Sequence, residues 1–447
     1  MSAKECDLLV IGGGPAGFWA GLVGAIKGLK TILAEEGPLG GTCLNRGCVP
    51  LAVFLNYISA LRLVKKLADE GYGVSLKDLT IDAVNMFKSI KSKVVDPLSG
   101  SMRGVLENLG VEVINGRALL ESGNSARVGS EVIKFKRAVV ATGLRWGGIN
   151  GAMPPTEFTD IDEVPSTVVV IGGNAFGLGI ASAFSLLGSE VILVEDGELL
   201  SGFDKEIVDY VTLALLERGV RIFTNAKVVN IINKGDIKET HLINPEGELR
   251  ISSDEVIDAS TYVPRNEVFG GVSVRLKGGY VAVDEYLRTS TPNIYAAGDI
   301  TGNLPYAHVA IVQGIIAGLN ASGGNLRVNY KAVPKYLYAY PDAFSAGLTE
   351  AEAKELGYEV AVARQSLTSN ALAKASGSEG IIKIVVDAKY GGILGIHGAG
   401  VGISELINEA AILLGLESTS DAVLATFLAH PTVGEVLREA LIQVTKS

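Results

Sequence analysis

Two of the three cysteines, Cys43 and Cys48, lie five residues apart in the glycine-rich segment from Gly40 to Pro50. In a regular helix this offset is about 7.5 Å along the axis and points the side chains to different faces. Cysteines in a disulfide have Cα atoms about 5.5–6 Å apart. The backbone must therefore distort if the thiols are to react with each other, and Gly47 permits this. A thiolate at a helix start is favoured by the helix dipole. The segment is a candidate redox pair, with two unreactive structural cysteines as the alternative.

A strand, a glycine turn and an acidic residue form a unit that occurs twice in the chain. In the first copy the apolar run Cys6–Ile11 leads into Gly12, Gly14 and Gly17. Glu35 follows Gly12 by 23 residues. Such glycines allow a tight turn and the close approach of a diphosphate, whose charge then lies at a helix N-terminus. The acidic residue accepts hydrogen bonds from a ribose diol. The first copy therefore predicts a dinucleotide site.

The second copy repeats this unit with one change. The run Val168–Ile171 leads into Gly172 and Gly177, and Glu195 again follows the first glycine by 23 residues. Asn174 replaces the middle glycine. Asparagine tolerates unusual backbone angles better than most residues, but its side chain intrudes where a diphosphate should lie. One glycine turn alone also occurs for packing reasons, whereas two copies with equal spacing favour two nucleotide sites.

Two more segments end short predicted strands. Ala141–Gly143 follows the run Arg137–Val140, in a position typical of a chain that returns toward the first nucleotide site. Asp299 ends the run Asn293–Gly298, where a carboxylate could hold a hydroxyl of a flavin's polar chain. Each segment by itself is more typical of an ordinary turn at a strand end.

The composition indicates a globular enzyme. Of the 447 residues 48% are apolar and 20% are charged, and the formal net charge is −10. An acidic chain offers no field that attracts nucleic acid or anionic lipid. Two uncharged stretches long enough to span a bilayer, Leu8–Ile26 and Ser166–Ser189, both break into glycines, and the N-terminus lacks the regions of a signal peptide. We expect a soluble, cytoplasmic protein that binds neither nucleic acid nor membrane and has no metal site.

With these motifs the chain resembles the flavoprotein pyridine nucleotide-disulfide oxidoreductases over essentially its whole length, and most closely their dihydrolipoamide dehydrogenase branch. Two C-terminal motifs, Pro341–Glu350 and His430–Glu435, add to the resemblance. It implies an α/β fold with two Rossmann-like dinucleotide-binding domains and a C-terminal α+β dimerisation domain. The expected parts are residues 1–148 (FAD-binding, first part), 149–265 (NAD-binding), 266–328 (FAD-binding, central part) and 329–447 (dimerisation).

The resemblance also implies two cofactors. The residues expected to hold FAD are Gly12, Gly14, Gly17, Glu35, Gly41, Thr42, Ala141, Thr142, Gly143, Asp299 and Ala307. Those expected to hold NAD are Gly172, Asn174, Gly177 and Glu195. NAD is favoured over NADP because Glu195-Asp196 would repel a 2′-phosphate and no arginine stands beside them.

The catalytic roles implied by the resemblance fall on four residues. Cys43 is the outer thiol that exchanges with the substrate, and Cys48 is the inner thiol that faces the flavin. His430 is the acid–base catalyst and Glu435 is its orienting partner, both supplied by the other subunit of a homodimer. The substrate is dihydrolipoamide or a lipoyl-bearing protein. The remaining histidines are expected to be structural.

Three departures from the family pattern keep other functions open. A lysine expected four residues after Cys48 is Ala52, the glutamate that pairs with it is Gly179, and Ser260–Arg265 replaces a Gly-Arg-x-Pro-Asn segment. We interpret Ala52 and Gly179 as one coherently lost ion pair. The first alternative is a specialised lipoyl-carrier or other disulfide oxidoreductase, for example in sulfur metabolism, with impaired or absent NAD reactivity. The second is a non-catalytic flavin-binding scaffold.

Periodicity predicts further elements. Residues 53–68 and 81–109 are expected to be helices, and residues 115–139 an antiparallel meander. Residues 380–396 are expected to form a strand pair that turns at 389–392, and residues 404–414 an interface helix.

Overall fold

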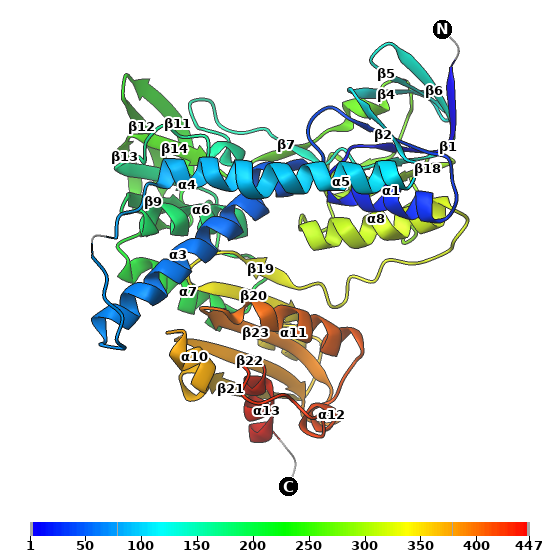
Figure 1. Ribbon diagram of the computed structural model, residues 1–447. Coiled ribbons are helices and arrows are strands. Elements are labelled where there is room, and N and C mark those ends of the chain that lie inside the picture. The colour runs from blue at the N-terminus through cyan, green and yellow to red at the C-terminus, as the bar shows by residue number, and fades with distance from the viewer. Residues whose placement is uncertain (1–2, 78, 378, 445–447) are drawn as a thin grey trace. The chain divides into compact units, whose positions relative to one another are not determined.

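The computed structural model describes residues 3–77, 79–377 and 379–444 (Figure 1). The chain divides into two compact units, each made of three separate stretches. The first comprises Met1–Pro50, Phe87–Gly148 and Thr261–Asn329, and the second comprises Leu51–Met86, Ile149–Ser260 and Tyr330–Ser447. The four domain boundaries expected from the sequence stay a prediction.

A seven-stranded sheet forms the centre of the first unit. Its strand order is β3-β2-β1-β6-β5-β4, and β18 also pairs with β6. The pairs that join β3, β2, β1, β6 and β18 are parallel, whereas β4, β5 and β6 form the predicted antiparallel meander. The strands are β1 (Lys4–Ile11), β2 (Thr31–Glu35), β3 (Glu112–Asn115), β4 (Ala118–Ser122), β5 (Ser125–Val128), β6 (Glu131–Val140) and β18 (Ile294–Ala296).

Burial on both faces explains the continuous apolar run of β1. Leu9 and Ile11 belong to one hydrophobic core, and Leu8 and Val10 belong to another. All four side chains are at most 2% exposed. A central parallel strand that is covered on both sides has this composition.

Helices α1 (Pro15–Ile26) and α8 (Ala307–Ala321) lie side by side in the first unit (Figure 1). They approach closely through small residues, because a β-carbon added at Gly314 would lie 2.2 Å from the Ala16 carbonyl oxygen. The uncharged stretch after the first glycine turn is therefore a packing helix of an α/β unit, as the glycine pattern predicted.

The helix predicted over residues 81–109 is present but irregular. Helix α4 (Ala83–Ile90) passes through a π-helical turn, Lys91–Val95, into α5 (Asp96–Asn108). Pro97 lies in the first turn of α5 and has no N–H to donate to the turn before it. The wider turn is located where that donor is missing.

Short elements complete the first unit. Strands β7 (Leu144–Trp146) and β15 (Tyr262–Pro264) pair antiparallel, as do β16 (Leu276–Lys277) and β17 (Tyr280–Val281). Two 3-10 turns cover Asn266–Phe269 and Asp299–Thr301.

The second unit contains a second parallel sheet, in the order β10-β9-β8-β14. Strand β8 leads through the second glycine turn into α6 (Ala175–Leu186), so the repeat seen in the sequence is also a structural repeat. An antiparallel sheet of β11, β12 and β13 follows. The elements are β8 (Thr167–Ile171), β9 (Glu190–Val194), α7 (Lys205–Glu217), β10 (Arg221–Phe223), β11 (Lys227–Lys234), β12 (Ile237–Asn244), β13 (Gly247–Ser253), β14 (Glu255–Asp258) and a 3-10 turn at Pro155–Glu157.

A five-stranded antiparallel sheet, in the order β19-β20-β23-β22-β21, forms the C-terminal part of the second unit. The predicted strand pair is β22 with β23, and the predicted interface helix is α11. The elements are β19 (Lys335–Leu337), β20 (Asp342–Gly347), α9 (Glu350–Glu355), β21 (Val360–Ser366), α10 (Ala371–Ala375), β22 (Gly380–Asp387), β23 (Ile393–Gly400), α11 (Leu406–Gly415), α12 (Ser420–Leu424) and α13 (Glu435–Leu441), with 3-10 turns at Leu367–Ser369, Ile403–Glu405 and Ile442–Val444.

A buried ionic cluster ties α7 to this C-terminal sheet. The Lys383 ammonium group on β22 is 3% exposed and lies 3.0 Å from the Asp204 carboxylate, 2.7 Å from Glu206 and 3.1 Å from Glu350. Arg364 adds a second cation at Glu206. A buried charge is tolerated when it is paired in this way.

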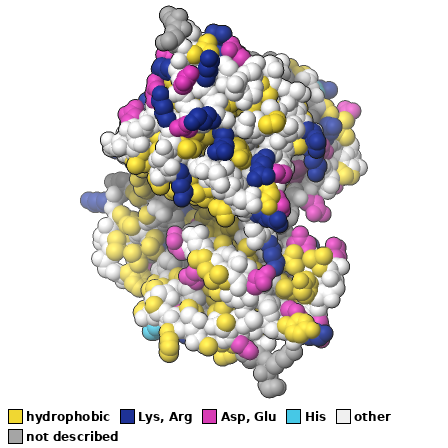
Figure 2. Space-filling model, turned by 90° about the vertical axis from the view of Figure 1, so that its right-hand side faces the viewer, with side chains coloured by type: hydrophobic (Ala, Val, Ile, Leu, Met, Phe, Trp, Pro, Cys, Tyr) yellow, Lys and Arg dark blue, Asp and Glu magenta, His cyan; other side chains and the backbone are white. Residues whose placement is uncertain are grey.

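Residues 41–69 form one helical stretch that is long and apolar enough to cross a bilayer by length and composition. This stretch is not one of the two uncharged stretches noted in the sequence. Core helices of soluble proteins pass the same test, and one such helix is a weak indication of a membrane span. On the face of the molecule drawn in Figure 2, lysine and arginine side chains are interspersed with acidic ones.

Candidate active site

The cysteine pair lies at a break between two helices of the chain. Helix α2 (Gly41–Arg46) ends at Gly47, whose backbone angles are φ −134° and ψ −113°, and α3 (Cys48–Asp69) begins directly after it. The distortion expected at Gly47 is therefore present. It brings the two thiols of Cys43 and Cys48 into a hydrogen bond with each other.

The turn that precedes α2 holds the cysteine segment against the first glycine loop. Gly40 has φ +100°, and a β-carbon at Gly41 would lie 2.7 Å from the Cα of Gly14. The Asn45 side chain fixes this turn, because its Nδ2 donates to the carbonyl oxygens of Leu39 (3.0 Å) and Gly41 (2.9 Å). The redox candidate and the first nucleotide loop are thus direct neighbours.

The two thiols are electrostatically unequal. The hydrogen bond from Cys43 lowers the pKa of Cys48, which is the first residue of α3. The same hydrogen bond, followed by burial, raises the pKa of Cys43, and the nearby Asp299 carboxylate raises it further. Of the two thiols, Cys48 is therefore the one that loses its proton more readily.

The third cysteine, Cys6, has a different environment. It lies in β1 and is 6% exposed. Burial raises the pKa of its thiol to about 12. Because the thiolate is the reactive form of cysteine, Cys6 is inert at neutral pH.

The first glycine loop has the shape of a dinucleotide cradle. Gly12 has φ +100°, and a β-carbon there would lie 2.4 Å from the Ala141 carbonyl oxygen. A β-carbon at Gly17 would lie 1.7 Å from the Gly12 carbonyl oxygen. Glycine is therefore required at both positions. The expected segment Ala141–Gly143 lies against this loop. Helix α1 begins directly after Gly14, and among the described residues no side chain caps its first turn.

Two acidic residues outside this loop, Glu35 and Asp299, are the further candidates for binding the same cofactor. Glu35 at the end of β2 accepts hydrogen bonds from the N–H groups of Gly13 (2.5 Å) and Gly37 (2.8 Å). Its position beside the loop suits the hydroxyls of a ribose. Burial raises the pKa of Asp299 to about 6, and a hydroxyl donor would relieve this desolvation. The glycine loop has no room for side chains, the first amides of α1 are uncapped, and two carboxyl groups are present. Together these features fit FAD.

The other residues expected at FAD lie in the same unit. Thr42 precedes Cys43 in α2, Thr142 donates its hydroxyl to the Arg265 carbonyl oxygen (3.2 Å), and Ala307 begins α8. Gln313 was not predicted from the sequence; it is fully buried in α8 and accepts the N–H of Gly298 at 2.6 Å. A glutamine inside an otherwise apolar helix was the available signal.

The second glycine loop has the same backbone with a different helix start. Gly172 has φ +112°, and a β-carbon at Gly177 would lie 2.0 Å from the Gly172 carbonyl oxygen. Glu195 accepts the N–H groups of Gly173 and Gly197, as Glu35 does in the first loop. The Asn174 side chain caps helix α6. The turn and the acid fit a nicotinamide dinucleotide, and the capped helix start is the one departure.

The expected acid–base pair is formed in the second unit. His430 Nδ1 lies 3.1 and 3.0 Å from the two carboxylate oxygens of Glu435. Glu435 also accepts the Thr432 N–H and an Arg438 N–H, both at 3.0 Å. The Thr432 N–H is the largest cause that lowers the pKa of Glu435, so this carboxylate stays ionised. His430 itself is 80% exposed, and Phe427, three residues earlier in the chain, is fully exposed, as residues that meet another subunit would be.

The buried histidine His397 is structural, as expected. Its ring lies 2.5 Å from the Ser345 hydroxyl and 3.1 Å from the Leu348 carbonyl oxygen. Burial lowers its pKa to about 4, so it is neutral.

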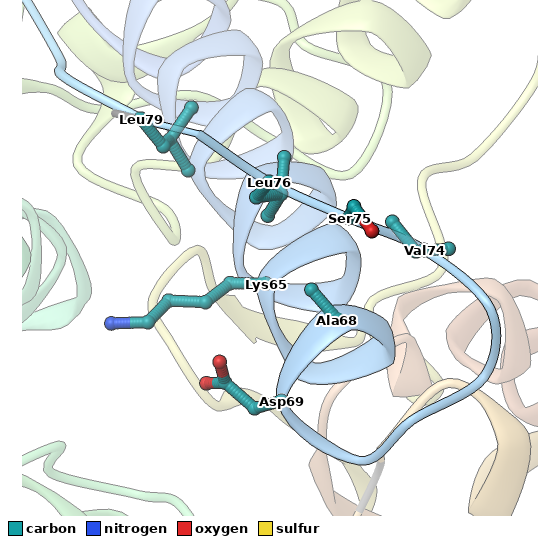
Figure 3. A pocket seen from close by; sticks show the side chains of 7 residues that line it. All are labelled: Lys65, Ala68, Asp69, Val74, Ser75, Leu76 and Leu79. Carbon is teal, nitrogen blue, oxygen red and sulfur yellow. The ribbon is translucent and has the colours of Figure 1, made fainter.

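An open pocket lies at the C-terminal end of α3 (Figure 3). It is lined by Lys65, Ala68, Asp69, Val74, Ser75, Leu76 and Leu79. Along the helix, Lys65 is 17 residues beyond Cys48, which corresponds to roughly 25 Å. The pocket is therefore not part of the dithiol site.

Two dinucleotide-type loops, one of them beside a polarised pair of thiols, define a redox protein that couples thiols to bound dinucleotides. Residues 6–314 match the family model of the pyridine nucleotide-disulphide oxidoreductases, and residues 333–441 match the dimerisation domain of the same family. The chain belongs to the pyridine nucleotide-disulphide oxidoreductase family.

Curated relatives and solved structures agree with this family. A dihydrolipoyl dehydrogenase of Geobacillus stearothermophilus is 32% identical and one of Bacillus subtilis is 31% identical, and each alignment covers 98% of this chain and 96% of the relative. The crystal structure of LpdA from Mycobacterium tuberculosis superposes with a TM-score of 0.89 at 25% identity, over 98% of this chain and 100% of that chain. The flavoprotein disulfide reductase RclA of Escherichia coli shares the fold, with a TM-score of 0.86 at 24% identity and coverage of 98% and 100%.

The comparisons confirm the predicted family, fold class and cofactors. The chain is an FAD-dependent disulfide oxidoreductase of the lipoamide dehydrogenase type, and this type uses FAD and NAD(H). Its C-terminal part is a dimerisation domain. The roles of individual site residues are proposals, which follow.

Proposed function

We propose that the chain oxidises the dithiol of dihydrolipoamide or of a lipoyl-bearing protein through a Cys43–Cys48 disulfide, with NAD⁺ as the final acceptor. The observation that carries this proposal is the polarised thiol pair, in which the pKa of Cys48 is lowered and that of Cys43 is raised. The relatives named dihydrolipoyl dehydrogenases support the lipoyl substrate. We place the enzyme in the cytoplasm as a homodimer.

The first exchange attacks the outer sulfur. One substrate thiol gives its proton to His430 and its sulfur forms a bond to Cys43 Sγ, the Cys43–Cys48 bond breaks, and Cys48 leaves as a thiolate. A thiol of low pKa is the better leaving group. The lowered pKa of Cys48 therefore directs attack to Cys43.

The second exchange releases the product. The remaining substrate thiol attacks the substrate sulfur bound to Cys43, so that the lipoyl disulfide forms. Cys43 departs and takes up the proton of this second thiol, which its raised pKa favours. Two electrons and one of the two substrate protons then reside on the cysteine pair, and the second proton is on His430 until it passes to solvent.

Glu435 keeps His430 ready for the first exchange. Because the carboxylate binds Nδ1, Nε2 remains the basic atom. The Thr432 N–H and Arg438 fix the carboxylate in turn. We propose that His430 of one subunit serves the cysteine pair of the other, which makes the homodimer a requirement of the mechanism.

The residues proposed to bind the two cofactors belong to the two glycine loops and the acidic residues paired with them. Gly12, Gly17, Glu35 and Asp299 would hold FAD, and Gly172, Gly177 and Glu195 would hold the nicotinamide dinucleotide. When bound, these groups supply the two-electron chemistry that removes the electrons from the cysteine pair. Contact between Gly41 and Gly14 keeps the cysteine helix beside the first loop.

A second candidate is a disulfide oxidoreductase with impaired NAD reactivity, which the capping of α6 by Asn174 favours. Anaerobic titration separates the two. In the first case both dihydrolipoamide and NADH bleach the flavin absorbance, whereas in the second only dihydrolipoamide does.

The test of the main proposal is turnover of dihydrolipoamide with NAD⁺ by single cysteine variants. Cys43→Ser and Cys48→Ser should each abolish turnover while FAD stays bound. Cys6→Ala is the matched control and should remain active, because Cys6 is buried and its thiol pKa is about 12. Lipoamide turnover that persists in Cys48→Ser would refute the assignment.

A further inference from the structure

The two glycine loops differ at one position, and the backbone does not require the difference. Gly14 has φ −69° and ψ −172°, and Asn174 has φ −80° and ψ 173°. Both are extended conformations that any residue adopts. Strain in the turn therefore does not explain the asparagine. The explanation must come from the hydrogen bonds of its side chain.

The Asn174 carboxamide uses all of its hydrogen bonds but one. Its Oδ1 accepts the N–H groups of Phe176 at 3.0 Å and Gly177 at 3.1 Å. Its Nδ2 donates to the Ala259 carbonyl oxygen at 2.7 Å. The side chain is thus held between the start of α6 and the end of β14.

These hydrogen bonds occupy the groups that a diphosphate would use. In a dinucleotide loop the first amides of the helix point toward the diphosphate and bind it. In the first loop the described residues provide no cap at Gly14, so those amides are available. In the second loop Asn174 binds two of these amides. The Gly172 turn and the hydrogen bonds of Glu195 match their counterparts in the first loop.

We infer that the Asn174 side chain competes with the diphosphate of nicotinamide dinucleotides for the amides of α6 and so weakens their binding. The inference rests on the proposed function, in which the second loop holds the dinucleotide. Binding requires the carboxamide to give up its hydrogen bonds to Phe176, Gly177 and Ala259. Asn174 is in this sense a residue that sets cofactor affinity, and it leaves the thiol exchange untouched.

The replacement that tests this is Asn174→Gly, measured by the affinity of the FAD-loaded dimer for ADP-ribose. ADP-ribose carries the diphosphate and the adenosine but cannot exchange electrons, so calorimetry reports binding alone. We expect about 10- to 100-fold tighter binding, because two modest amide hydrogen bonds are replaced by charge-assisted ones. Glycine costs little as a cap, and Asn174→Ala is the second variant should the first be poorly folded.

Two controls assign the effect to the diphosphate. Adenosine, which has the ribose but no phosphate, should bind wild type and Asn174→Gly equally. Asn174→Asp keeps the cap and adds a negative charge, so it should bind ADP-ribose more weakly than wild type.

Three results would overturn the inference. ADP-ribose affinity could be unchanged in Asn174→Gly, or it could fall, which would make the carboxamide a direct ligand of the diphosphate. Adenosine affinity could rise as much as that of ADP-ribose. None of these outcomes touches the thiol proposal, which fails separately if Cys48→Ser turns over lipoamide.

Discussion

The converse substitution, Gly14→Asn, should give α1 the same kind of helix cap that Asn174 gives α6. The backbone at Gly14 is extended, and a β-carbon there would meet nothing closer than the Gly41 Cα at 3.8 Å. The new side chain can therefore fold into place and accept the N–H groups of Ala16 and Gly17, as Asn174 does two and three residues further on in its own loop.

The expected cost falls on FAD binding. Two charge-assisted hydrogen bonds to a diphosphate contribute about 1.5–3 kcal/mol each, and the neutral cap replaces them with about 0.5–1.5 kcal/mol each. The difference is about 2–3 kcal/mol, or a rise in the dissociation constant of FAD of roughly 30- to 150-fold. The apoprotein should fold normally, because an asparagine cap stabilises a helix by about 1 kcal/mol.

The assay is reconstitution of the apoprotein with FAD, followed by the recovery of flavin absorbance and by calorimetry. Gly14→Ala is the control, because it adds a β-carbon without a capping group. If Gly14→Asn binds FAD as tightly as wild type, or if Gly14→Ala weakens binding equally, competition for the helix amides is the wrong explanation.

The remaining predictions concern charged residues. Burial raises the pKa of Asp299 to about 6, so its ionisation costs the apoprotein stability as the pH rises from about 4 to 6. Asp299→Asn should be more stable than wild type by on the order of 3 kcal/mol at pH 8 and equal to it below pH 4 by thermal melting, and a constant difference would contradict this. Glu435→Gln should lower turnover roughly 10- to 100-fold from pH 6 to 9, because the pKa of Glu435 is lowered and the wild-type carboxylate is ionised throughout; unchanged turnover would remove Glu435 from the mechanism. Lys383→Met should leave three carboxylates without their buried cation and destabilise the protein by about 3–5 kcal/mol in chemical denaturation, whereas wild-type stability would show that Arg364 alone neutralises the cluster.

Much of the architecture is encoded in local patterns of the sequence. Apolar runs that end in glycine turns predicted both parallel sheets. A strand buried on both faces must be apolar, and a tight turn into a helix needs glycine. The distortion at Gly47 followed from the five-residue offset of Cys43 and Cys48, because a regular helix cannot bring such residues together.

Features that depend on distant residues could not be read in this way. At Gly179 an added β-carbon would lie 2.5 Å from the Tyr338 carbonyl oxygen and 2.7 Å from the Leu51 side chain. The backbone of a remote segment thus leaves no room for the family's glutamate there. Likewise, the intrusion of Asn174 was foreseeable from its size, but its hydrogen bond to Ala259 depends on the end of another strand.

A count of reactive thiols in the two redox states tests directly whether Cys43 and Cys48 form a redox-active disulfide. The enzyme would be denatured anaerobically in an alkylating reagent, before and after reduction by dihydrolipoamide, and the labelled peptides identified by mass spectrometry. We expect one labelled cysteine, Cys6, in the oxidised enzyme and all three after reduction. Labelling of Cys43 and Cys48 in the oxidised enzyme, or a count that reduction leaves unchanged, would contradict a redox-active disulfide between them.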